Sequence, residues 1–337
     1  MIFGSVAVAE AEGAILAHAV RTDTMTLKKG ERLDKARLQR LSEAGVASVI
    51  AARLEPGDVG EDEAAAKLAE RIALDHVRRD RAFTGRVNMF AEVGGLVEVE
   101  AATIARVNAV DEAITVATLP EHRAVARGDM VATVKIIPFA VPGAALNAAL
   151  AAAGQGAVRI APFRPLKIGV ASTMLPGLKP SVVAKTLKVL EARLTPAGAR
   201  IVAELRVPHD ADALARAIET LIPISDAIIV FGASAITDRR DVIPTAIERG
   251  GGRVAHFGMP VDPGNLLLLG AHGDVPILGA PGCARSPKEN GFDWVLQRIL
   301  AGVPISAADI RAMGVGGLLM EIASRPQPRL GDARDDG

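Results

Sequence analysis

After residue 165 the chain alternates regularly between two kinds of apolar segment. Short continuous apolar runs are typical of buried strands, and the longer segments between them repeat apolar residues every three or four positions, as amphipathic helices do. Alternating strands and helices favour a parallel sheet. The pattern therefore predicts a doubly wound α/β domain over residues 165–305, with a mostly parallel sheet and helices on both faces. The predicted strands are 167–172, 200–206, 227–231, 253–257, 266–269 and 275–278, and the predicted helices are 180–194, 210–221, a segment starting at Asp241, and 292–301.

The first 160 residues show a less regular pattern, which predicts a smaller, β-rich α+β region in front of the α/β domain. Its helical part, 30–77, contains expected helices at 33–44 and 61–77 with a strand between them. Short β-branched runs between 83 and 141 predict a β-rich unit. Residues 306–337 form a C-terminal extension, and its tail beyond Ser324 is expected to be disordered because it is rich in charges, proline and glycine.

Composition excludes several function classes. The chain has 337 residues, with 39 Lys and Arg against 39 Asp and Glu, so no net charge attracts nucleic acid or an anionic membrane. No segment has the pattern of an export signal or a membrane span. The single cysteine, Cys283, excludes an internal disulfide framework and fits a reducing compartment. We therefore expect a cytoplasmic protein with neither a nucleic-acid nor a membrane partner.

Three loops rich in Gly, Pro and small polar residues follow predicted strands, at 232–238, 258–265 and 279–286. Ligands of open α/β sheets bind at the carboxyl ends of the strands. Small residues there allow backbone N–H groups to approach phosphate oxygens, and helices starting after the loops add positive dipole ends. Each loop taken alone is equally typical of a tight turn. Together, with the nearby basic residues Arg239, Arg240, Arg285 and Lys288, they predict a phosphate-binding site.

Asp241 has two interpretations at the start of its predicted helix. A carboxylate beside a phosphate site can bind Mg²⁺ through its oxygens, which would make Asp241 a catalytic and metal-binding residue. The alternative is a helix N-cap, a position that Asp favours. Asp238 and Asp262 are weaker candidates for the metal.

Other catalytic patterns are largely absent. The chain has no Gly-x-x-x-x-Gly-Lys-Ser/Thr phosphate loop, no Gly-x-Gly-x-x-Gly after a strand and no His-Glu-x-x-His zinc motif. Ser234 follows a strand as a hydrolase nucleophile does, with Asp262 and His272 after it in the order of a catalytic triad. The second glycine of that motif is missing, because Ala235-Ile236 follow the serine. A serine hydrolase is therefore a remote alternative.

The loops and their spacing resemble the molybdopterin-binding domain of molybdopterin adenylyltransferases and molybdopterin molybdenumtransferases. Residues Asp226-Ala-Ile-Ile-Val-Phe-Gly232 are similar to the strand that enters that family's Gly-Gly loop, and Thr237-Asp-Arg-Arg-Asp-Val-Ile-Pro-Thr-Ala246 is similar to its Arg-Asp-Val-Thr-Pro-Glu-Ala segment. Val261-Asp-Pro-Gly-Asn265 and Leu278-Gly-Ala-Pro-Gly282 resemble its two later loops. The resemblance covers residues 165–305.

This resemblance implies a protein of molybdenum cofactor biosynthesis, closest to the molybdenumtransferases, that inserts molybdate into molybdopterin or adenylated molybdopterin. It implies a transferase that uses Mg²⁺ at Asp241. The residues expected to contact molybdopterin are Gly232, Ala233, Ser234, Thr237, Pro263, Gly264, Asn265, Gly279, Pro281, Gly282, Arg285 and Ser286.

The chain also departs from the family pattern. Ala233 replaces the second glycine of the Gly-Gly loop, Asp262 replaces a lysine, and Cys283 replaces an asparagine. The chain has no Tyr, so the family's N-terminal Asp-x-Ser-Ala-Met-Asp-Gly-Tyr stretch is not intact. These departures favour an alternative, a non-catalytic module that hands the cofactor to a cytidylyltransferase or to an apo-molybdoenzyme. The family's frequent oligomerisation suggests a homodimer.

Overall fold

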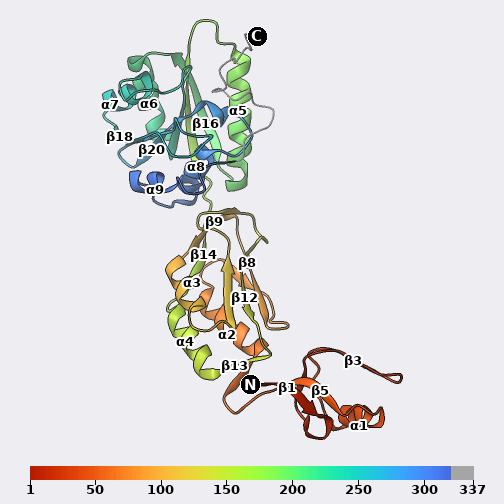
Figure 1. Ribbon diagram of the computed structural model, residues 1–337. Coiled ribbons are helices and arrows are strands. Elements are labelled where there is room, and N and C mark those ends of the chain that lie inside the picture. Colours follow the sequence, from red (N-terminus) through yellow and green to blue (C-terminus); the bar gives the residue numbers. More distant parts are fainter. Residues whose placement is uncertain (320–337) are drawn as a thin grey trace, which may run out of the picture. The chain divides into compact units, whose positions relative to one another are not determined.

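The computed structural model describes residues 1–319 and divides the chain into two compact units, Met1–Pro162 and a second beginning at Phe163 (Figure 1). The first unit contains two hydrophobic clusters. The second contains two further clusters, one on each face of its sheet. No helix of the described part is both long and apolar enough to cross a membrane.

The first cluster of unit one lies among residues 1–53. Strands β1 (Ile2–Ala7), β5 (Ser48–Arg53) and β2 (Ile15–Leu16) form an antiparallel sheet, and helix α1 (Lys35–Glu43) begins at Asp34, whose side chain accepts a hydrogen bond from the Arg37 N–H. A small hairpin consists of β3 (Val20–Arg21) and β4 (Thr26–Leu27). The fully buried Leu16, Leu33 and Leu41 hold these elements together.

Three sheets and three helices make up the rest of unit one. One sheet has the strand order β10-β12-β8-β7, the second β11-β9-β14, and the third β13-β6. Helices α2, α3 and α4 pack with these sheets around the second cluster. The bounds are β6 (Asp58–Gly60), α2 (Glu61–Ile72), β7 (Val77–Arg79), β8 (Arg86–Ala91), β9 (Gly95–Val99), α3 (Ala101–Asn108), β10 (Ile114–Thr118), β11 (Ala124–Val125), β12 (Met130–Ile136), β13 (Ala140–Pro142), α4 (Gly143–Ala153) and β14 (Val158–Pro162).

One expectation for unit one was wrong in detail. Helix α2 ends at Ile72, because Ala73 is extended, and Val77 instead pairs with Ala91 in a sheet where its side chain is buried. The segment 83–141, expected to be β-rich, holds β8 to β13 and also contains α3, whose Thr103 and Val107 are buried. Tertiary burial outweighs the weak helix propensity of these β-branched residues.

Unit two confirms the predicted α/β class. Its six-stranded sheet has the order β16-β15-β17-β20-β19-β18, and only β19 runs against the others. The strands are β15 (Lys167–Met174), β16 (Arg200–Pro208), β17 (Ala227–Phe231), β18 (Arg253–Phe257), β19 (Leu268–His272) and β20 (Val275–Ala280).

Helices cover both faces of this sheet (Figure 1). Helices α5 (Pro180–Leu194) and α8 (Gly291–Ala301) pack on one face through Leu190, Leu194 and Ile299, joined there by α9 (Ala307–Ala312). Helices α6 (Ala211–Leu221) and α7 (Val242–Arg249) pack on the other. The central strand β17 is buried on both sides, as its unbroken apolar sequence predicts. The tail expected to be disordered lies outside the described residues.

The start of α6 provides a test of the local structure. The Asp210 side chain accepts a hydrogen bond from the Ala213 N–H at 2.9 Å. Replacing it with alanine leaves that N–H without its partner, so we expect Asp210→Ala to lower the free energy of unfolding by about 1 kcal/mol. Urea denaturation measures this change. The control is Asp212→Ala in the same first turn, where only the exposed pair with Arg249 is lost and the change should be about half as large or less.

Candidate functional site

The carboxyl ends of the parallel strands bring the three predicted loops to one edge of the sheet. Ser172 of β15 lies opposite Phe231 of β17, and Phe231 lies opposite Ala280 of β20. Since adjacent strands are about 4.8 Å apart, the loops after β17 and β20 are direct neighbours. The loop after β18 ends at the same edge, because β18 runs parallel to β20.

Thr173, at the end of β15, ties three strands together at this edge. Its side chain is 1% exposed, and its hydroxyl oxygen accepts a hydrogen bond from the Ala233 N–H at 2.8 Å. The same hydroxyl lies 2.9 Å from Nδ1 of His209, just after β16. The Ala233 amide of the Gly232 loop is therefore already occupied by a protein group.

Arg285 ties the loop after β20 to its neighbours. Its guanidinium donates to the Gly232 carbonyl at 2.8 Å and to the Thr186 hydroxyl at 3.0 Å, and it lies 5.4 Å from the centre of the Phe231 ring. Burial lowers the pKa of the Arg285 guanidinium from its ordinary value. Arg285 thus fixes the shape of the two loops and keeps only part of its donor capacity for a ligand.

Arg193 of α5 organises the segment that follows. It donates to the Ala284 carbonyl at 2.8 Å and to the Ser286 carbonyl at 2.7 Å, and it pairs with Asp293 at 2.5 Å. The Arg193 and Asp293 side chains are only 10% and 11% exposed. Residues 284–288 therefore take their shape from a buried ion pair that the sequence pattern did not reveal.

The two helix starts expected to face a phosphate are capped by protein groups. At α8, the Gly291 N–H donates to the Pro263 carbonyl at 2.8 Å, and the Asn290 side chain accepts from the Phe292 N–H at 3.2 Å. At α7, the Asp241 carboxylate accepts from the Val242 N–H at 2.7 Å and from the Thr237 N–H at 3.1 Å. The N-cap interpretation of Asp241 is confirmed. The first N–H groups of α8 are likewise occupied by protein acceptors.

The twelve residues expected to contact molybdopterin differ in accessibility. Four are exposed: Ser234, Thr237, Asn265 and Gly282. Five are partly buried: Gly232, Ala233, Pro263, Arg285 and Ser286. Three are buried: Gly264, Gly279 and Pro281.

The buried glycines serve packing. A Cβ on Gly279 would lie 2.8 Å from the Ile236 side chain, and one on Gly264 would lie 2.8 Å from the Gly291 nitrogen. Gly264 also has a φ of +145°, which a side chain would strain. These positions let the loops approach their neighbours and leave ligand contact to the exposed members.

Several backbone amides at the edge are open, among them those of three exposed residues. The N–H groups of Ser234, Ala235 and Gly282 make no hydrogen bond within residues 1–319. A Cβ on Gly282 would meet nothing within 4 Å, so open space lies in front of this residue. Unpaired amides around open space are what an oxyanion needs, since each supplies a donor without a fixed charge.

The loop 175–179 after β15 belongs to the same edge, although it is not among the three loops predicted from the sequence. It carries Pro176, Gly177 and Lys179 and leads directly into α5, whose N-cap makes no side-chain hydrogen bond. The signal was present, because the segment is a Gly- and Pro-containing stretch between a predicted strand and helix. Thr173 and Arg193, in contrast, gave no local signal.

Charges around the edge are largely paired. Arg240 hydrogen-bonds the Asp238 carboxylate at 2.8 Å, which lowers the pKa of Asp238. Burial lowers the pKa of His256 on β18, and the positive charges of Arg311 and Arg239 lower it further. The lowered pKa favours the neutral form of His256. Arg239 and Lys288 are the exposed basic residues of the predicted loops that lack a side-chain partner among residues 1–319.

No group of three or more His, Cys, Asp and Glu side chains suited to a metal ion occurs in the described chain. Asp241 still retains lone pairs, because each carboxylate oxygen can accept more than the one N–H it now binds. Mg²⁺ that arrives with phosphate oxygens needs only one or two protein carboxylates. Asp241 therefore fits as the single protein ligand of a Mg²⁺ ion that arrives with phosphate oxygens.

The serine hydrolase arrangement is not assembled. Ser234 follows the carboxyl end of β17, whereas His272 pairs with Val275 at the beginning of β20. Phe231 lies opposite Ala280, five positions further along β20, and this separation corresponds to about 16 Å at strand spacing. Ser234 and His272 lie at opposite edges of the sheet.

Comparison with known proteins addresses the ligand of this edge. Residues 172–310 match the family described as a probable molybdopterin binding domain. This match confirms the resemblance to the molybdopterin-binding family and supports a role in molybdenum cofactor biosynthesis. Residues 5–53 match a domain of unknown function, DUF8806. Among the curated proteins none matches the chain.

Solved structures similar to the chain include a molybdopterin biosynthesis moeA protein from Pyrococcus horikosii, with 17% identity, a TM-score of 0.30, and coverage of 90% of this chain and 76% of that one. A molybdenum cofactor biosynthesis protein from Pyrococcus furiosus has 11% identity and a TM-score of 0.26, with 92% and 65% covered. The molybdopterin biosynthesis enzyme MoaB from Thermus thermophilus has 15% identity and a TM-score of 0.28, with 41% and 98% covered.

The Arg193–Asp293 pair provides a test of the loop architecture. Arg193→Met leaves the Asp293 carboxylate buried without its partner and frees three carbonyls, so we expect the free energy of unfolding to fall by about 3 kcal/mol. Chemical denaturation measures the change. Arg249→Met, which breaks an exposed pair with Asp212, is the matched control and should cost less than about 1 kcal/mol. Equal losses in both variants would contradict a special role for Arg193.

Proposed function

We propose that this protein binds molybdopterin by its phosphate on the loops at the carboxyl ends of β15, β17 and β20, as a step of molybdenum cofactor biosynthesis. The observation that carries the proposal is the set of open N–H groups of Ser234, Ala235 and Gly282 on two adjacent loops of the matched domain. The net charge of the chain is zero, so an anionic ligand has to be held by such local donors.

The basic residues of the loops divide into two roles in this proposal. Arg193 and Arg285 hold loop carbonyls and keep the open amides in place. Arg239 and Lys288 are exposed and supply positive charge to a phosphate. Phosphate binding then depends on a preformed backbone arrangement, and the charged side chains add attraction from outside.

Gly282→Val tests the binding site directly. The valine side chain fills the open space in front of the loop, and the fold tolerates it because a Cβ at this position meets no atom within 4 Å. We expect affinity for molybdopterin to fall at least about tenfold, since the phosphate loses its approach to the amides. Fluorescence titration with molybdopterin and with adenylated molybdopterin measures the loss.

The matched control is Gly4→Val on β1, where an added Cβ also meets no atom within 4 Å. It should leave binding unchanged. If the wild-type protein binds neither pterin form, or if Gly282→Val binds both as well as the wild type does, the proposed site is wrong.

Molybdate insertion is the reaction we propose for this site, and the position of Asp241 favours it. Its carboxylate accepts the Thr237 N–H on the Gly232 loop, so a negative charge lies beside the proposed phosphate site. When bound, Mg²⁺ would neutralise phosphate and molybdate charge there. Asp241 would hold the ion, and the loop amides would hold the phosphate in position.

Asp241→Asn separates the two roles of this residue, because asparagine also caps helices but carries no charge. Asparagine has one side-chain oxygen, so it can keep the bond from the Val242 N–H but loses that from the Thr237 N–H. We therefore expect the free energy of unfolding to fall by about 1 kcal/mol, and molybdopterin binding to change much less than turnover. Mg²⁺-dependent formation of molybdenum cofactor from molybdate should fall at least about a hundredfold. The assay compares product formation with and without Mg²⁺.

Binding without turnover in the wild type would instead favour the non-catalytic module, which hands the cofactor to a cytidylyltransferase or a molybdoenzyme. Turnover that Asp241→Asn leaves intact would exclude Asp241 as the metal ligand. Sedimentation of the wild-type protein decides whether the expected homodimer forms.

A further inference from the structure

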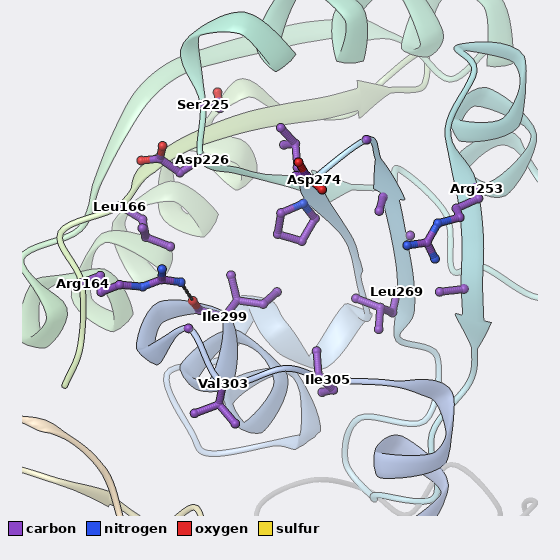
Figure 2. Close-up of a pocket in the computed structure, with 17 residues that line it drawn as sticks. Arg164, Leu166, Ser225, Asp226, Arg253, Leu269, Asp274, Ile299, Val303 and Ile305 are labelled. Atoms are coloured by element: carbon purple, nitrogen blue, oxygen red, sulfur yellow. Dashed lines mark hydrogen bonds between the residues drawn. The ribbon is translucent and has the colours of Figure 1, made fainter. Parts of the chain in front are cut away.

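A cavity of about 630 Å³ opens at the opposite edge of the same sheet (Figure 2). Residues near the amino ends of β15, β17, β18 and β20 line it, together with the end of α8 and the segment after it. The volume is typical of sites that bind small molecules. None of the twelve residues expected to contact molybdopterin lines this cavity, so it is separate from the candidate functional site.

Much of the cavity wall is apolar. Small residues on β18 and β19, Ala255, Gly270 and Ala271, leave room between the larger side chains. A ligand with a ring or short hydrocarbon chain would displace water from this surface, which favours binding. The large apolar lining residues are Leu166, Leu269, Pro276, Ile299, Val303 and Ile305.

Two guanidinium groups lie on opposite sides of the cavity (Figure 2). The Arg164 guanidinium already has protein partners, because it donates to the Ile299 carbonyl at 3.3 Å and packs against Gly302. Arg253, from β18, turns its guanidinium toward the cavity and makes no side-chain hydrogen bond or ion pair within residues 1–319. Arg253 is therefore available to a ligand in the open cavity.

The acidic lining residues limit the charge of that ligand. Asp226 already accepts the Lys167 N–H at 2.7 Å, whereas Asp274 lies exposed in the turn between β19 and β20. The Asp274 carboxylate repels a ligand that carries a second negative charge. The Arg253 guanidinium can pair with one carboxylate through two parallel N–H groups. The lining thus matches one negative group joined to an apolar body.

We propose that this cavity binds a small monocarboxylic acid with an apolar ring or short chain. The carboxylate pairs with the Arg253 guanidinium, and the apolar part lies on Ile299, Ile305 and their neighbours. This site is independent of the molybdopterin site at the other edge of the sheet.

Fluorine NMR titration of the full chain tests the proposal with three probes of one shape. These are fluorophenylacetate, the neutral fluorophenylacetamide and the cationic fluorophenethylamine. The acid should bind most tightly, and Arg253→Gln should weaken its binding about tenfold without changing that of the amide. Asp274→Asn should strengthen binding of the acid. Ala271→Leu, which fills the cavity, should weaken the acid and the amide alike.

The control is Arg200→Gln on β16, an exposed arginine near the same edge that does not line the cavity. It should leave all three affinities unchanged. Equal affinities for the three probes, a preference for the amine, or unchanged binding of the acid to Arg253→Gln would each overturn the proposal. Molybdopterin titration of Arg253→Gln should match the wild type, so the two sites fail or succeed separately.

Discussion

The pairing of β17 with β15 on one side and β20 on the other is the constraint on which unit two depends. Every residue of Ala227–Phe231 is buried, so both faces of this strand need a cover of apolar side chains. Helices α5 and α8 cover one face of the strand, and helices α6 and α7 cover the other. The same register aligns Ser172, Phe231 and Ala280, so the loops that follow these strands meet at one edge.

That edge is built by side chains that bind backbone groups. Thr173 occupies the Ala233 amide, and Arg285 and Arg193 occupy carbonyls of Gly232, Ala284 and Ser286. Each of these bonds removes a donor or acceptor that a ligand would otherwise find. The open amides of Ser234, Ala235 and Gly282 lie on loops held by these bonds, and a preorganised loop loses less entropy when an anion binds.

The sequence was informative wherever structure follows from neighbouring residues. The strand-helix alternation after residue 165, the caps at Asp210 and Asp241 and the position of three loops all follow from local patterns. Accessibility within the loops did not, because Thr173 acts on a residue 60 positions away and Arg193 on residues 91 and 93 positions away. A Gly-rich loop therefore predicts close backbone approach, and only the structure distinguishes approach to a ligand from approach to another loop, as at Gly264 and Gly279.

The two edges of the sheet differ in chemistry because one presents open backbone amides and the other presents mainly side chains. At the carboxyl edge the chain leaves strands for helices, and loop amides face open space. At the amino edge, Ile299 near the end of α8 and the turn of β19 and β20 bring apolar side chains and one unpaired arginine together within the described chain. An oxyanion with many acceptors suits the first arrangement, and an apolar molecule with one charge suits the second. In these two proposals a single fold presents two surfaces that would select ligands by different physical means.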